Sequence, residues 1–189
     1  MKKLLFFLAA VAIAVVGIII AKPYIDSYKD RQKYEFTLNT IDGEIKLSDY
    51  RGKAVAIFFG YMYCPDVCPT ALSMLSESLK GLSEDELKNF EGIFISVDPD
   101  RDTLKNLKDY AKYFHSNFIG ATSTNEKILE ISKNYGAYYV KEKESEDDKN
   151  YSVAHTSYIY VFDKYGNLSS KLDHSILPSG ITKALKKAL

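Results

Sequence analysis

The sequence predicts an α/β domain in which helices cover the faces of a β-sheet. Two observations support this. Short apolar runs typical of buried strands occur at residues 55–59 and 93–97, and segments with the spacing of amphipathic helices alternate with such runs. The chain has 189 residues, of which 46% are hydrophobic, so it is long enough to bury one sizeable core. We therefore expect a single domain over residues 34–189.

An apolar segment precedes this domain. Residues 4–21 are uncharged and mostly apolar, and they follow Lys2 and Lys3. As a helix, this run would be about 27 Å long, close to the hydrocarbon thickness of a bilayer. We expect one N-terminal transmembrane helix over residues 1–22, with a cleaved signal sequence as the alternative, and a polar tether over residues 23–33. The flanking lysines and the lack of an Arg-rich presequence favour a bacterial inner (cytoplasmic) membrane, with the domain facing the periplasm or exterior.

Two signals predict the strands, namely apolar residues at alternating positions and turn residues between the apolar runs. Residues 36–38 and 45–47 flank Asp42-Gly43, a dipeptide typical of hairpin turns. Buried strands are expected next at residues 55–59 and 93–97. Further strands are expected at residues 118–119, 137–140, 158–162 and 168–172, with a turn at residues 164–167.

Capping residues and periodic apolar positions predict the helices. We expect helices at residues 70–80, in a short segment opened by a capping box of Ser83 and Glu86, at residues 103–115, between Thr124 and Gly136, and at residues 178–189. Residues 141–150 carry many charges and are expected to form a loop.

The two cysteines of the chain, Cys64 and Cys68, lie in the loop between the first buried strand and the helix that follows it. Each precedes a proline, and the residue before a proline is disfavoured in the α region. We therefore expect both cysteines to be non-helical, with Cys68 as the N-cap and Pro69 as the first helical residue. Both sulfurs would lie near a helix N-terminus, where the partial positive charge favours the thiolate. The pattern indicates a soft-metal site or a redox pair, and a structural disulfide is the weaker interpretation because so short a loop restrains the unfolded chain little.

A metal site would need a third ligand, and the chain has three histidines. His155 precedes the strand at residues 158–162, at the sheet edge where the cysteine loop should also emerge. His115 ends a predicted helix and His174 lies in a polar segment, so both have simpler structural interpretations. Two thiolates and an imidazole favour copper or zinc over hard cations and leave the site open on one side. A closed four-ligand structural zinc site is not supported.

Charge and a further polar segment complete the sequence pattern. Lys plus Arg and Asp plus Glu number 25 each, so there is no bulk charge to attract nucleic acid.

Residues 98–103, Asp98-Pro99-Asp100-Arg101-Asp102-Thr103, connect a strand to a helix. Most of these charges have a structural explanation, although the carboxyl ends of strands are where open α/β sheets place their sites.

Three separated motifs closely resemble those of the SCO/SenC family. They are Cys64-Pro65-Asp66-Val67-Cys68-Pro69 within residues 60–70, the segment of residues 98–103, and Val153-Ala154-His155-Thr156. The resemblance covers about residues 34–189. Two positions differ from the family pattern: Ala154 stands where the family often has Asp, and Tyr63 stands where it often has His.

The resemblance implies a thioredoxin-like fold with a central mixed sheet flanked by helices, in a membrane-tethered protein. It also implies a copper chaperone that exchanges copper, as Cu(I) or Cu(II), with other copper carriers and delivers it to the copper-site subunit of cytochrome c oxidase during assembly. By motif, the copper ligands would be Cys64, Cys68 and His155. Asp98 would contribute to the geometry of the site.

A second function stays open, that of a thiol–disulfide oxidoreductase which reduces the copper-ligand cysteines of the oxidase subunit through Cys64 and Cys68. Thioredoxin-type reductases use a two-residue spacing and a cis-proline that faces the cysteines. The prolines of this chain are at positions 23, 65, 69, 99 and 178, and none lies just before the strand at residues 158–162. We therefore favour metal binding over disulfide exchange, and rank a peroxidase last.

Overall fold

The computed structural model of the protein describes residues 2–142 and 151–189, which divide into two units, Met1–Lys33 and Tyr34–Leu189. The first unit belongs to one helix, α1 (Lys2–Tyr34), which continues through Pro23 into the segment predicted as a polar tether. Within the described residues, no helix has both the length and the apolarity that a membrane span requires. The predicted transmembrane helix over residues 4–21 is therefore not confirmed.

The second unit opens with the predicted hairpin. Strands β1 (Thr37–Thr40) and β2 (Gly43–Lys46) pair antiparallel, with Thr40 opposite Gly43. Gly43 has a φ of 122°, a conformation that residues with a Cβ rarely adopt, and this explains the glycine at the turn. A single 3-10 turn, η1 (Leu47–Tyr50), leads from the hairpin to the main sheet.

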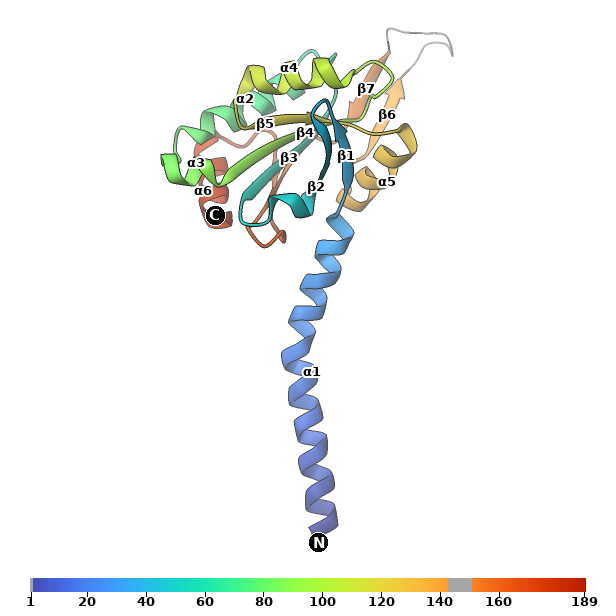
Figure 1. Ribbon diagram of the computed structural model, residues 1–189, viewed down its shortest axis with the longest axis vertical. Helices are drawn as coiled ribbons and strands as arrows, with labels where there is room; N and C mark the ends of the chain where they lie inside the picture. The colour runs from blue at the N-terminus through green and yellow to red at the C-terminus, as the bar shows by residue number, and fades with distance from the viewer. Residues whose placement is uncertain (1, 143–150) are drawn as a thin grey trace. The chain divides into compact units, whose positions relative to one another are not determined.

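Five strands form the main sheet in the order β5-β4-β3-β8-β9 (Figure 1). Its strands are β3 (Ala54–Gly60), β4 (Phe90–Ser96), β5 (Phe118–Ala121), β8 (Tyr158–Phe162) and β9 (Leu168–Asp173). The first three are mutually parallel, while β8 runs antiparallel to β3 and β9 runs antiparallel to β8. The predicted mixed sheet is confirmed.

Five helices form in the domain near the predicted positions, and those that follow Ser83, Thr103 and Thr124 begin where these capping residues predicted. They are α2 (Val67–Leu79), α3 (Glu84–Lys88), α4 (Leu104–Phe114), α5 (Asn125–Tyr135) and α6 (Pro178–Ala188). Ser83, Thr103 and Thr124 each accept a backbone N–H at the start of a helix. Gly136 ends α5 in the left-handed conformation, which is the usual role of glycine there.

The helices cover both faces of the sheet. Phe58 of β3 lies opposite Phe94 of β4 in the parallel register, so both side chains point to the same face, where Phe94 contacts Tyr110 of α4. The adjacent Phe59 points to the other face, where its ring lies 5.1 Å from that of Tyr135 of α5. Helix α6 packs against α2 and the sheet. Burial of one such aromatic side chain contributes about 2 kcal/mol to the free energy of unfolding. Because Phe58 and Phe59 point to opposite faces, β3 is covered by core on both sides.

A small separate sheet carries one of the predicted site residues. Strands β6 (Tyr139–Glu142) and β7 (Ser152–His155) pair antiparallel, with Tyr139 opposite His155. The sequence did not predict β7, because four residues with no long apolar run give a weak pattern. The prediction of a loop over residues 141–150 was wrong for its first two residues, since Lys141 and Glu142 belong to β6. Residues 143–150 of the predicted loop lie outside the described part of the chain.

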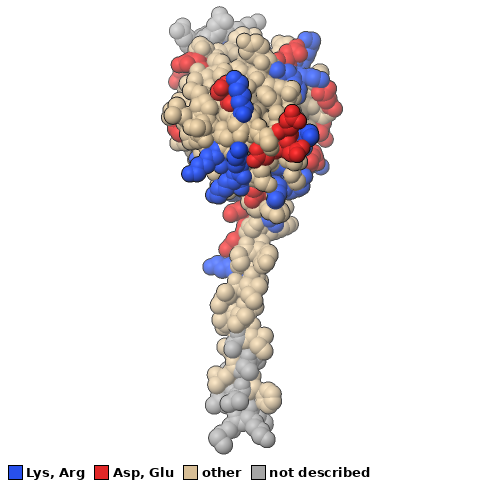
Figure 2. Space-filling view, turned by 90° about the vertical axis from the view of Figure 1, so that its left-hand side faces the viewer, with Lys and Arg blue, Asp and Glu red and all other residues tan. Residues whose placement is uncertain are grey.

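Charges are mixed over the domain surface. Figure 2 shows Lys and Arg side chains beside Asp and Glu side chains on the face drawn, with uncharged areas between them. This distribution agrees with the equal totals of 25 basic and 25 acidic residues. The face in view offers no continuous basic surface of the kind that binds nucleic acid.

Candidate metal centre

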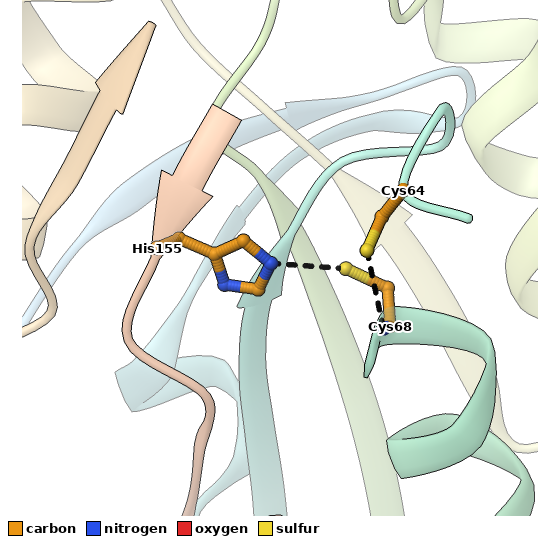
Figure 3. Close-up of side chains that lie close together, drawn as sticks. All are labelled: Cys64, Cys68 and His155. Carbon is orange, nitrogen blue, oxygen red and sulfur yellow. Dashed lines mark hydrogen bonds between the residues drawn. The ribbon is translucent and has the colours of Figure 1, made fainter. Parts of the chain in front are cut away.

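Cys64, Cys68 and His155 come together at one edge of the main sheet (Figure 3). Their two sulfurs and a ring nitrogen all lie within 4.8 Å of one another. The Sγ atom of Cys68 is 3.3 Å from Nε2 of His155, and the Cys68 backbone N–H donates to Sγ of Cys64 at 3.5 Å. Among the described residues this is the group of His, Cys, Asp and Glu side chains that could hold a metal ion.

The topology of the sheet explains the convergence. The cysteine loop leaves the carboxyl end of β3, and β8 runs antiparallel to β3 with Ile159 opposite Phe58. The chain must therefore enter β8 at the edge where β3 ends, and His155 lies just before that entry. The predicted meeting of this histidine with the cysteine loop is confirmed.

The start of α2 differs from the prediction. The helix begins at Val67 with Asp66 as its N-cap, so Cys68 is helical and the predicted N-cap role of Cys68 was wrong. Pro69 is tolerated because the N–H groups of a first helical turn have no intrahelical partner. The first helical bond runs from the Thr70 N–H to the Asp66 carbonyl at 3.1 Å. Cys64 stays outside the helix, and its sulfur faces the helix N-terminus as expected.

Gly60, the last residue of β3, allows the buried sulfur to approach the sheet. A Cβ at this position would lie 2.6 Å from Sγ of Cys68 and 2.9 Å from Cε2 of Phe94. Such contacts are too short for any side chain, so only glycine leaves room for the sulfur. The sequence analysis did not assign this role, although a glycine at the end of a buried strand is a signal of close approach.

The two thiols have opposite proton affinities. A hydrogen bond from the Cys68 side chain, together with backbone N–H groups of Cys68 and Asp66, lowers the pKa of Cys64 to about 4, against the opposing effect of burial. The pKa of Cys68 is raised, because its thiol is bonded to the Cys64 sulfur and because the side chain is buried. Without metal, the pair therefore holds one thiolate, on Cys64, and one proton, on Cys68. The expected thiolate is confirmed for Cys64, whereas the same expectation for Cys68 was wrong, because burial and the bond to the Cys64 sulfur keep its proton in place.

We predict that Cys64 alone is reactive in the reduced, metal-free protein. Its thiolate form is present above its lowered pKa of about 4 and is lost as the pH falls through that value. Alkylation by iodoacetamide, followed by fragment mass spectrometry, should therefore show half-maximal reaction of Cys64 near pH 4 and little modification of Cys68 at neutral pH. A half-maximal reaction of Cys64 near the ordinary thiol pKa would contradict this, and the Cys64→Ser variant gives the baseline.

His155 presents the correct nitrogen to the sulfurs. Its Nδ1 lies 3.0 Å from the carbonyl oxygen of Thr156, which can only accept, so Nδ1 carries the proton and Nε2 keeps its lone pair. Histidine ligands of metals commonly donate their other ring N–H to a backbone carbonyl in this way. The ring stands edge-on to Phe58 and Tyr61, at centroid distances of 6.2 and 5.9 Å.

The predicted acidic residue, Asp98, lies outside this group of three side chains. Its carboxylate is completely buried and accepts hydrogen bonds from Nε of Arg101 and from the hydroxyl of Tyr151, each at 2.5 Å.

A second acidic residue, Asp102, holds the cysteine loop by accepting from the Met62 N–H at 3.0 Å. The sequence analysis gave Asp102 no role in the site. Burial raises the pKa of Asp102, and it also accepts from the hydroxyl of Ser96 at 2.5 Å.

The two positions that differ from the family pattern are both exposed. Ala154 lies next to His155 on β7 and points away from it, so an acidic side chain at this position would face solvent. The Tyr63 side chain is 63% exposed and lies beside Arg101, whose guanidinium carbon is 5.0 Å from its ring centre. His115 and His174 lie outside the three-residue group, as predicted.

Known proteins share both the sequence and the fold of this chain. The SCO1/SenC family model matches residues 26–189. The SCO2-like protein of Rickettsia felis is 33% identical over 165 residues, which cover 86% of this chain and 80% of that protein. The structure of Bradyrhizobium japonicum ScoI with copper bound has a TM-score of 0.72 and 34% identity, covering 82% of this chain and 98% of that one.

A third similar protein, BsSco, was described as a member of the Sco family of cytochrome c oxidase assembly proteins in which a disulfide switch was identified. It has a TM-score of 0.63 and 25% identity, with 82% of this chain and 91% of that one covered. The family-model match spans most of the chain, and the sheet and helices match thioredoxin-like Sco structures. The Rickettsia felis and Bradyrhizobium japonicum proteins exceed 30% identity over most of their length. The chain belongs to the SCO1/SenC family.

Proposed function

We propose that this protein is a copper chaperone that binds copper through Cys64, Cys68 and His155 and delivers it to cytochrome c oxidase during assembly. The observation that carries the proposal is the convergence of two sulfurs and one imidazole nitrogen within 4.8 Å, contributed by two segments that lie far apart in the sequence. The copper-bound state of a ScoI relative and the description of BsSco as an oxidase assembly protein support it.

The donor set suits copper in either oxidation state. Thiolates are soft ligands that select Cu(I), and imidazole together with thiolate also suits Cu(II). Three protein ligands leave the metal accessible from one side, which a carrier needs if it is to transfer its cargo. Cys64 is the partly exposed sulfur and Cys68 the buried one, so an incoming ligand would reach the copper from the side of Cys64.

Membrane attachment is a separate part of the proposal. An anchor at residues 4–21 would hold the domain on the outer side of a bacterial cytoplasmic membrane, near an oxidase embedded in the same bilayer. The supporting feature is the uncharged apolar run after Lys2 and Lys3. Release of the full-length protein from cell membranes by alkaline carbonate would contradict it.

A second candidate function is supported by the asymmetric thiol pair. The Cys64 thiolate could attack a disulfide in the copper-site subunit of the oxidase to form a mixed disulfide, and Cys68 could then resolve it. The products would be a Cys64–Cys68 disulfide in this protein and two reduced cysteines in the target. The lowered pKa of Cys64 favours the first step.

Copper titration separates the two functions. The reduced full-length protein should bind about one copper ion per chain, since it contains one set of three ligands, and Cu(II) should produce a thiolate-to-copper charge-transfer band. Failure to bind copper tightly, combined with rapid reduction of an oxidase-subunit disulfide, would instead assign the protein to the oxidoreductases.

A further inference from the structure

Arg101 contacts both segments that supply the candidate metal ligands, the cysteine loop and the chain before His155. Its guanidinium carbon is 3.7 Å from the ring centre of Tyr151 and 5.0 and 5.7 Å from those of Tyr63 and Tyr61. Tyr61 and Tyr63 belong to the loop that carries the cysteines, whereas Tyr151 immediately precedes β7. One side chain therefore contacts both the dithiol loop and the chain that leads to His155.

Hydrogen bonds strengthen the contact on the histidine side. Nη1 of Arg101 donates to the Tyr151 carbonyl at 2.8 Å, and Nε donates to the carboxylate of Asp98 at 2.5 Å. The same carboxylate accepts from the Tyr151 hydroxyl at 2.5 Å and lies 3.2 Å from Nζ of Lys141 in β6. Strand β6 and the residue that precedes β7 are thus tied to one buried carboxylate and, through it, to Arg101.

These ties matter because β6 and β7 form a two-stranded sheet of their own in the described part of the chain. Main-sheet pairing fixes β3, from which the cysteine loop emerges, but it does not fix the strand that ends at His155. A two-stranded sheet has little stability or fixed position by itself. The short link to β8 brings the end of β7 near the cysteine loop, and side-chain contacts hold it there, namely those of Arg101 and the bond from the Val153 N–H to the Tyr61 hydroxyl at 3.3 Å.

We propose that Arg101 is a positioning residue that sets the distance between His155 and the two cysteines. This inference rests on the proposed copper site. Arginine suits the role because its planar guanidinium can stack on a tyrosine ring and donate in several fixed directions at once, which a lysine ammonium cannot do. The side chain of Arg101 is only 15% exposed and that of Asp98 is fully buried, so the pair is shielded from solvent and holds one geometry.

A double-mutant cycle in the full-length protein tests this role. The Cu(I) dissociation constant, measured by competition with a chromophoric chelator, should rise about 10-fold in Arg101→Lys, as is usual when the groups that orient a metal ligand are lost. The same substitution in a His155→Ala background should have no further effect, because Arg101 acts through that histidine. An equal effect in both backgrounds would overturn the proposal.

A metal-free measurement separates this inference from the proposed function. Amide hydrogen exchange should become faster in β6 and β7 of the Arg101→Lys variant, including at Val153, while α2 and β3 stay protected. Unchanged exchange in β6 and β7 would overturn the positioning role even if copper binds. Absence of copper binding in the wild type would remove the proposed function but leave this test in place.

Two further variants serve as a second probe and as a control. Tyr151→Phe keeps the stacked ring and the backbone carbonyl and removes only the hydroxyl bond to Asp98, so it should shift both readouts in the same direction by a smaller amount. Arg51→Lys is the matched control, since Arg51 forms a partly exposed ion pair with Glu35 and lies outside the site. A shift in Arg51→Lys equal to that in Arg101→Lys would show a general effect of the substitution and would also overturn the proposal.

Discussion

Replacing Cys64 or Cys68 by serine should lower Cu(I) affinity by at least about 1000-fold. Tetrahedral zinc sites bind with about 10–16 kcal/mol over four ligands, so one ligand is worth about 3 kcal/mol, or roughly 100-fold in affinity. The loss should be greater for Cu(I) because a serine hydroxyl is a hard, protonated group in place of a soft thiolate. Chelator competition on each purified variant measures the effect.

The fold should survive these substitutions. Serine is slightly smaller than cysteine, so it fits beside Gly60 at position 68. Ser73→Ala, on the exposed face of the same helix, is the matched control and should bind copper as the wild type does. Stoichiometric, tight Cu(I) binding by a folded Cys64→Ser or Cys68→Ser protein would contradict the proposed site.

Local sequence patterns predicted most of the elements because their signals lie within a few residues. Ser83, Thr103 and Thr124 cap the helices that follow them, and Gly136 ends one, as their side chains and backbone preferences require. The central strands β3, β4 and β8 were equally visible as buried apolar runs. The start of α2 was misplaced because hydrogen bonds in its first turn outweighed the local preference of Cys68, which precedes a proline.

The sequence predicted the ligands of the candidate site but not the residues that position them or make room for them. Cys64, Cys68 and His155 carry distinctive chemistry, and the order of strands brought them to one edge. Arg101 and Gly60 are common residue types whose roles depend on contacts across 50 and 8 positions of sequence, to Tyr151 and Cys68 respectively. Such roles become visible only when the three-dimensional contacts are known, because no local pattern distinguishes them from a surface charge or an ordinary glycine.

Replacing His155 by alanine should weaken copper binding without abolishing it. The two cysteines would remain, and two thiolates can hold Cu(I) alone, so we expect its affinity to fall by about 10- to 100-fold, corresponding to the loss of one ligand. Cu(II) should be affected more, because imidazole is the borderline ligand that suits the higher oxidation state. Chelator competition measures the first effect, and the charge-transfer band together with nitrogen hyperfine coupling in electron paramagnetic resonance measures the second.

The comparison with another histidine makes this result specific. His174→Ala removes a histidine that lies beside Asp173, away from the sulfurs, and should leave both copper readouts unchanged. The His155→Ala variant should stay folded, since the ring contributes edge contacts to Phe58 and Tyr61 worth about 1 kcal/mol. An unchanged Cu(I) affinity and an unchanged Cu(II) spectrum in that folded variant would remove His155 from the ligand set. The 3.3 Å approach of Nε2 to Sγ of Cys68 would then be a contact of the metal-free protein only.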